Sequence, residues 1–179
     1  MRAFITYGEL KSIVAKYDSA RILNEATVST GKTVFLSHSS KDNDILPGVI
    51  HILEAHGGKV YADVRDPALN NSDFTETAAH LRLAVRNCMK FVLLVTPRTK
   101  DSKWIPWELG LGDGANKDPN VALFPSAENS YEQSWSEQEY LGLYQRIIWG
   151  DFKGREKSEW MVLNHIENIG TELSTWLSQ

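Results

Sequence analysis

From Thr33 onward, short continuous apolar runs alternate with segments in which apolar residues recur at helical spacing. The runs are typical of strands covered on both faces; they read TVFLSH (33–38), KVYADV (59–64), KFVLLVTP (90–97), VALFPS (121–126) and QRIIWG (145–150). Helical spacing predicts helices over 42–57, 74–88, about 102–115 and 156–178. Strands that alternate with such helices imply βαβ units. We therefore predict an α/β fold: a five-stranded parallel, doubly wound sheet with helices on both faces.

The chain ahead of the first run differs in character. Helical spacing extends to about Ala20, and the polar stretch RILNEATVSTGK follows. We predict an N-terminal helical extension over 1–30 and one domain over 31–179, with a sheet that is flavodoxin-like in outline. Within that domain, Asp42 or Asp44 is predicted to cap the helix over 42–57, and Gly57-Gly58 to end it.

Composition narrows the function classes. The 179 residues suit one domain with a proper core, since 42% are hydrophobic. No apolar run approaches the roughly 18 residues of a membrane-spanning helix, and the N-terminus lacks the apolar core of a signal peptide. A net charge of −4 without a basic cluster argues against nucleic-acid binding. The lone Cys88 fits a reducing cytoplasm.

Polar side chains gather where the predicted strands end. In parallel α/β sheets, ligands bind outside the carboxyl ends of the strands. These ends carry Ser37, His38 and Ser39 on the first strand, Asp63 and Arg65 on the second, and Thr96 and Arg98 on the third. We therefore expect a ligand site at this rim.

The helix after the third predicted strand opens with SKWIPWELG (102–110). Ser102 is a plausible N-cap, and Pro106 indicates the first turn. Trp104 and Glu108 are four residues apart and share a helix face. The helix dipole favours an ionised Glu108, which suits a substrate that develops positive charge, such as a ribose oxocarbenium ion. The alternative is that the tryptophans are core residues and Glu108 is a solvated helix residue.

Other chemistries fit poorly. STGKT (29–33) precedes a strand instead of following one, unlike a phosphate-binding loop. GLGDG (110–114) falls near the end of a predicted helix, not at the strand-to-helix turn of a dinucleotide site. The histidines show no metal-ligand spacing, so we predict no metal site. Neighbouring residues of a strand point to opposite faces, which disfavours a Ser–His hydrolase built on His38.

Three segments carry a family resemblance. VFLSHSSKD (34–42) resembles the opening strand and loop of bacterial TIR domains, KVYADVRD (59–66) resembles the second strand leading into their BB loop, and SKWIPWEL (102–109) matches their W-x-x-x-E pattern. The resemblance covers about residues 33–126. It implies a TIR fold and an enzyme that cleaves the glycosidic bond of NAD and releases nicotinamide. Some members cyclise the ADP-ribose product. NAD would be the substrate, with no separate cofactor.

The resemblance also implies roles for individual residues. Glu108 corresponds to the catalytic glutamate and Trp104 to its aromatic partner. The other substrate-binding positions would be Ser37, His38 and Ser39 in the first loop, and Asp63, Arg65 and Phe74 around the BB loop. The chain departs from many relatives at the tip of that loop, where it has NNSD (70–73) and no glycine. Asparagine tolerates positive φ, so the turn remains feasible.

Size and family together resemble the stand-alone TIR proteins of the Thoeris antiphage defence system, in which the cyclic product activates a separate NAD-degrading effector. The implied partners are NAD, that effector, and other TIR domains through self-association. Two alternatives remain open. A non-catalytic TIR scaffold would act by assembly alone, and an enzyme resembling nucleoside ribosyltransferases would act on nucleosides.

Overall fold

The structure is a computed structural model, and it describes residues 4–28, 30–62, 74–102, 105–116, 119–129 and 139–179. These residues form a sheet in the order β3-β2-β4-β5-β6-β7-β8, and β1 pairs with β5 off this path. The strands are β1 (Ile5–Thr6), β2 (Val34–Ser37), β3 (Val60–Tyr61), β4 (Lys90–Val95), β5 (Val121–Ala127), β6 (Gln145–Asp151), β7 (Ser158–Asn164) and β8 (Ile169–Glu172).

The five predicted strands are β2 to β6, and their mutual pairings are all parallel. Their order places the first strand in the middle, with the second on one side and the third to fifth on the other. This is the flavodoxin-like order, in which the chain changes direction between the first and third strands. The predicted fold is confirmed. Beyond it, the sheet gains antiparallel β7 and β8 and the short β1.

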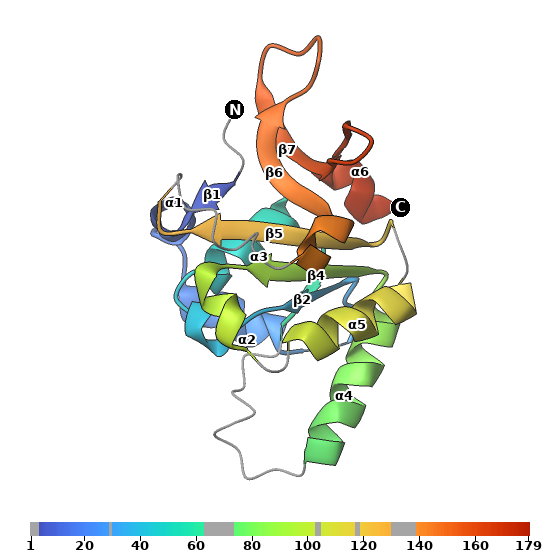
Figure 1. Cartoon of the computed structure of the whole chain (residues 1–179). Coiled ribbons are helices and arrows are strands. Elements are labelled where there is room, and N and C mark those ends of the chain that lie inside the picture. The colour runs from blue at the N-terminus through green and yellow to red at the C-terminus, as the bar shows by residue number, and fades with distance from the viewer. Residues whose placement is uncertain (1–3, 29, 63–73, 103–104, 117–118, 130–138) are drawn as a thin grey trace.

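The strands separate two apolar cores because successive side chains of a strand point to opposite faces. Val34, Leu36, Val92 and Leu94 belong to one core, with residues of α3 (Leu46–Ala55). Their neighbours Phe35, Phe91, Leu93 and Val95 belong to the other, with residues of α4 (Phe74–Asn87) and α5 (Ile105–Asn116). Helices therefore cover both faces of the sheet, as predicted (Figure 1).

The predicted helices around the sheet agree with α3, α4 and α5 apart from their ends. α3 begins at Leu46 instead of 42, after a short 3-10 helix η1 (Ser40–Asp42). Its C-terminal end follows the prediction, because Gly57 takes φ 96° just beyond it. A second 3-10 helix, η2 (Pro97–Asp101), connects β4 to the α5 region. None of the helices in the described part of the chain combines the length and apolar character needed to cross a membrane.

The predicted closing helix over 156–178 is wrong. The segment forms β7, β8 and only a short helix, α6 (Leu173–Ser178). The side chain of Asn164 accepts hydrogen bonds from the backbone N–H groups of Ile166 and Glu167, and Asn168 adopts φ 55°. These asparagines make a turn that the apolar spacing did not reveal. Pairing with β6 then buries Met161 and Val162 in a strand.

The N-terminal segment forms β1, α1 (Tyr7–Val14) and α2 (Ser19–Ala26). Thr6 and Glu9 form a capping box that starts α1, and Asp18 caps α2. β1 extends the sheet by pairing with the end of β5, and both helices pack on α3. The predicted division at residue 30 stays a prediction, although the two segments share one sheet and one core.

Candidate functional site

The switch in strand order lies between β2 and β4, and the side chain of Glu108 meets the end of β2 there. Ser37 is the last residue of β2 and is buried, whereas Glu108 lies in the first turn of α5 and is partly exposed. The Ser37 hydroxyl donates a hydrogen bond to the Glu108 carboxylate. The structure thus brings together two residues that the sequence assigned to one site.

The start of α5 follows from local sequence. The Ser102 Oγ accepts a hydrogen bond from the Ile105 N–H at 3.4 Å, and Pro106 occupies the first turn, both as predicted. Gly112 lets the helix approach the sheet, since a Cβ at that position would lie 2.4 Å from Cδ2 of the buried Phe91. This close approach places Glu108 at the carboxyl end of β2, next to Ser37.

His38 and Ser39 follow Ser37 in the first loop. Ser39 is buried and caps η1 by accepting a hydrogen bond from the Lys41 N–H at 3.3 Å. His38 is partly exposed. Both residues lie in the loop next to Ser37, whose hydroxyl contacts Glu108, and their predicted role in substrate binding stays a prediction.

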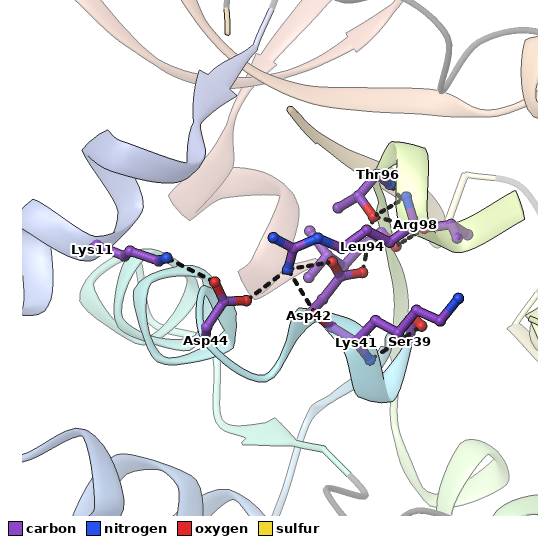
Figure 2. Close-up of polar contacts among 9 residues, drawn as sticks. Lys11, Ser39, Lys41, Asp42, Asp44, Leu94, Thr96 and Arg98 are labelled. Atoms are coloured by element: carbon purple, nitrogen blue, oxygen red, sulfur yellow. Dashed lines mark hydrogen bonds and ion pairs between the residues drawn. The ribbon is translucent and has the colours of Figure 1, made fainter. Parts of the chain in front are cut away.

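A polar cluster lies beside this loop; it joins Thr96 and Arg98, which the sequence placed at the rim of the sheet, to Asp42 and Asp44, which it did not assign to the site (Figure 2). The Thr96 hydroxyl donates to Oδ2 of Asp42 at 2.9 Å, and Nη1 of Arg98 lies 3.6 Å from Oδ1 of the same carboxylate. Arg98 also donates to the Lys41 carbonyl at 2.7 Å and pairs with Asp44 at 2.8 Å. The prediction that Asp42 or Asp44 caps the following helix is wrong, because α3 has no side-chain cap and both carboxylates face Arg98 instead.

The electrostatics of Asp42 are unusual for an aspartate. Its side chain is fully buried. Burial raises the pKa of Asp42 from its ordinary value of 3.8 to about 6, although the Thr96 hydrogen bond and the Arg98 charge favour the ionised form. The burial of Asp42 depends on β4 and η2, which are distant in sequence. The one signal in the sequence that could have identified Asp42 as part of the site is its position just after Ser37, His38 and Ser39.

Four predicted site residues are not placed by the structure. Asp63, Arg65 and Trp104 lie outside the described residues. Phe74 begins α4, but its side chain also lies outside them. Trp107, the neighbour of Glu108, is partly buried, and the guanidinium of Arg82 lies 5.4 Å from its ring centre.

The described residues contain no cluster of three or more His, Cys, Asp or Glu side chains suited to a metal ion. Two grooves of about 420 and 290 Å³ lie near Trp149 and Trp160, and neither includes Glu108. Around Ser37 the described residues present a carboxylate oriented by a hydroxyl, at the switch point where this class of sheet binds ligands.

Comparison with known proteins agrees with this geometry. A family model described as TIR domain matches residues 34–163. A Bacillus cereus (strain MSX-D12) protein named "Probable 3' cyclic ADP-D-ribose synthase ThsB'" is 33% identical over 149 residues, which cover 82% of this chain and 75% of the relative. The matched region contains the five parallel strands β2 to β6 together with Ser37 and Glu108. The chain belongs to the TIR domain family.

Proposed function

We propose that this TIR protein cleaves NAD at the nicotinamide–ribose bond and converts the ADP-ribose part into a cyclic product. The observation that carries the proposal is the Glu108 carboxylate, held by the Ser37 hydroxyl at the switch point of the sheet. The similarity to a relative whose name describes cyclic ADP-D-ribose synthesis supports the same reaction.

The chemistry suits a single carboxylate. Nicotinamide leaves a cationic pyridinium as a neutral molecule, so no acid is needed to protonate it. The ribose carbon then develops oxocarbenium character, and a nearby negative charge stabilises that transition state. In the proposed mechanism Glu108 supplies this charge and binds the ribose hydroxyls, while Ser37 orients it. NAD is the substrate, and the mechanism calls on no separate cofactor.

Product formation depends on what captures the ribose cation. Water gives linear ADP-ribose, whereas an oxygen or nitrogen of the same ADP-ribose gives a cyclic product. Excluding water favours cyclisation. In the proposal, His38, Ser39, Asp63, Arg65, Phe74 and Trp104 bind the rest of the substrate and enclose this step.

The biological setting is also part of the proposal. The product serves as a signal in Thoeris antiphage defence and activates a separate effector. Self-association through TIR–TIR contacts completes or activates the site. We expect the reaction in the cytoplasm, where NAD is abundant and the free thiol of Cys88 is maintained.

The first test is the substitution Glu108→Gln. It keeps the size of the side chain but removes the charge, so nicotinamide release from NAD is expected to fall by about 10²–10³-fold. Release is measured by chromatography, and mass spectrometry identifies the product with 3' cyclic ADP-D-ribose as a standard. Asp113→Asn is the matched control, because Asp113 is an exposed acid of the same helix, and this variant should keep full activity.

The outcomes separate the alternatives. Equal turnover by Glu108→Gln and the unmodified protein would reject Glu108 as the catalytic residue. The assay is run over a range of protein concentrations, because a site completed by self-association is inactive when dilute. Absence of nicotinamide release at every concentration would favour the non-catalytic scaffold, and release of bases from nucleosides would favour the ribosyltransferase-like enzyme.

A further inference from the structure

The end of β2 and the loop after it contact the chain that follows β4 at two places. At the first, the Ser37 hydroxyl reaches Glu108. At the second, the Asp42 carboxylate accepts a hydrogen bond from Thr96 at 2.9 Å, across 54 residues of chain. Both contacts link the end of β2 or the loop after it to the chain that follows β4, on either side of the switch point. The second contact therefore limits how far the loop that follows Ser37 can move relative to the segment leading to Glu108.

The hydrogen bond between Asp42 and Thr96 is connected to α5 through consecutive backbone hydrogen bonds. Thr96 caps η2, since its Oγ1 accepts from the Arg98 N–H at 3.1 Å, and its carbonyl accepts from the Thr99 N–H at 3.0 Å. The Thr99 carbonyl in turn accepts from the Ser102 N–H at 3.1 Å. Ser102 then caps α5 by accepting a hydrogen bond from the Ile105 N–H, four residues ahead of Pro106 and in front of the turn that carries Glu108. The position of Thr96 thus sets the start of this helix.

The N-terminal helix α1 holds the outer side of the same cluster (Figure 2). Lys11 forms an ion pair with Asp44 at 2.7 Å. The guanidinium of Arg98 lies 4.7 Å from the ring centre of Tyr7. Arg98 is therefore fixed between α1, Asp44 and the Lys41 carbonyl, with Asp42 beneath it. Asp42 is fully buried in this arrangement.

Burying the Asp42 carboxylate destabilises the folded protein, so stability alone does not explain an aspartate at this position. Its side chain is fully buried, and among the described residues Oδ1 accepts no hydrogen bond. The charged groups that face it are Arg98 on η2, Lys41 on η1 and Asp44 ahead of α3, and burial outweighs their combined effect, so the pKa is raised. We expect the protein to be at least as stable with a neutral side chain of the same size at position 42. Retaining a charge at such a cost is typical of functional positions.

We propose that Asp42 is a positioning residue for the reaction: by holding Thr96 and Arg98 it fixes the segment that leads to Glu108 against the loop that follows Ser37. This inference rests on the proposed NAD cleavage. Asp42 does not contact the reacting atoms, and it acts through the start of α5.

The test compares Asp42→Asn, Thr96→Val and the double variant. An asparagine presents one oxygen and one NH₂ group in place of the two carboxylate oxygens, so it cannot accept from Thr96 and also attract the Arg98 guanidinium with a second oxygen and a negative charge, and these contacts weaken without a change in size. Each single variant is expected to lower kcat for nicotinamide release by about 10- to 100-fold, with KM changed less than about threefold. The double variant should be no slower than the slower single variant, because the two residues act as a unit.

Asp151→Asn and Thr175→Val are the matched controls. Both positions are exposed and lie on β6 and α6, away from the cluster, so both variants should retain full kcat. Thermal melting at neutral pH checks folding, and Asp42→Asn should melt no lower than the unmodified protein. A kcat within twofold of normal for Asp42→Asn, or effects of the two substitutions that multiply, would overturn the proposal. So would a loss of kcat that matches a loss of folded protein.

Amide hydrogen exchange tests positioning without NAD. In Asp42→Asn, exchange should rise at least about tenfold at Thr99, Ser102 and Ile105, whose N–H bonds depend on the cluster, and stay unchanged in β5. Unchanged exchange at these three residues would overturn the proposal. Faster exchange in a protein that releases no nicotinamide would reject the proposed function and still support the positioning of Glu108 by Asp42.

Discussion

The carboxylate of Asp42 shows how much the role of one residue depends on its surroundings. In the sequence it stands just before an apolar helix, in a place typical of an N-cap. In the structure it is fully buried, and its oxygens face Thr96 and Arg98. The same residue type two positions later, Asp44, is exposed and pairs with Lys11. Burial, which is decided by β4 and η2, separates their roles.

The raised pKa of Asp42 predicts a pH dependence of stability. Because the pKa is about 6 in the folded protein and 3.8 ordinarily, the folded state binds the proton more tightly. The contribution of this group to the free energy of unfolding is therefore largest below pH 3.8 and declines as pH rises to about 6. A difference of this size corresponds to about 3 kcal/mol.

Asp42→Asn isolates this contribution, because asparagine does not titrate. Urea unfolding from pH 4 to 7.5 should show Asp42→Asn gaining stability relative to the unmodified protein, by up to about 3 kcal/mol at the upper end. The comparison cancels the other carboxylates, which the two proteins share. A difference in unfolding free energy that is constant over this range would contradict the buried, raised-pKa carboxylate.

At the scale of elements, the docking of α5 on the sheet determines where Glu108 lies. The helix contacts β2, β4 and β5, and Gly112 allows the approach by leaving room for the Phe91 ring. Phe91 has little freedom to move, since it is buried and stacks on Phe35 with ring centres 5.5 Å apart. The contact between Ser37 and Glu108 therefore depends on a glycine on the buried side of the helix.

Gly112→Ala is expected to destabilise the protein and to reduce nicotinamide release. The added methyl gains up to about 1 kcal/mol of helix propensity. Overpacking a rigid core costs about 1–3 kcal/mol, so the net effect is a loss. Gly110→Ala is the matched control in the same helix, because a Cβ there meets nothing within 4 Å, and it should stabilise the protein slightly. Urea unfolding measures the stability of both variants, and equal stability would contradict the proposed close approach.

At the scale of the whole molecule, the N-terminal segment is built into the sheet and one of its two cores. β1 lies beside the end of β5, and Leu10 of α1 is fully buried. α1 approaches α3 at Gly48, where a Cβ would lie 2.6 Å from the Leu10 carbonyl oxygen. Through Tyr7 and Lys11, the same helix reaches the Arg98 cluster. The segment thus connects the edge of the sheet to the loops of the candidate site.

Gly48→Ala should displace α1 from α3, because a backbone oxygen, unlike a flexible side chain, cannot move away alone. We expect a loss of about 1–3 kcal/mol in stability and faster hydrogen exchange over residues 7–14. Gly8→Ala is the control within α1, since a Cβ there meets nothing within 4 Å. Exchange over 7–14 that is as slow in Gly48→Ala as in Gly8→Ala would show that the two helices do not require this glycine.

Local patterns in the sequence determined a large part of this protein. Continuous apolar runs predicted all five parallel strands, because residues buried on both faces leave no polar positions. Ser102 and Pro106 predicted the start of α5, since capping and the fixed φ of proline act within one turn. The position of Glu108 near that start followed directly. The pattern failed over 156–178, where the apolar residues suited a helix and a strand equally and one turn, made by two asparagines, favoured strands.

Tertiary structure alone decided which of these residues meet. Ser37 and Glu108 are 71 residues apart, and Asp42 and Thr96 are 54 apart. Spacing along the chain fixes which face of an element a side chain occupies, but the order of strands and the docking of helices fix its partner. Whether a carboxylate becomes a cap, a surface ion pair or a buried positioning group depends on that partner and on access to water, and neither is a local property of the sequence.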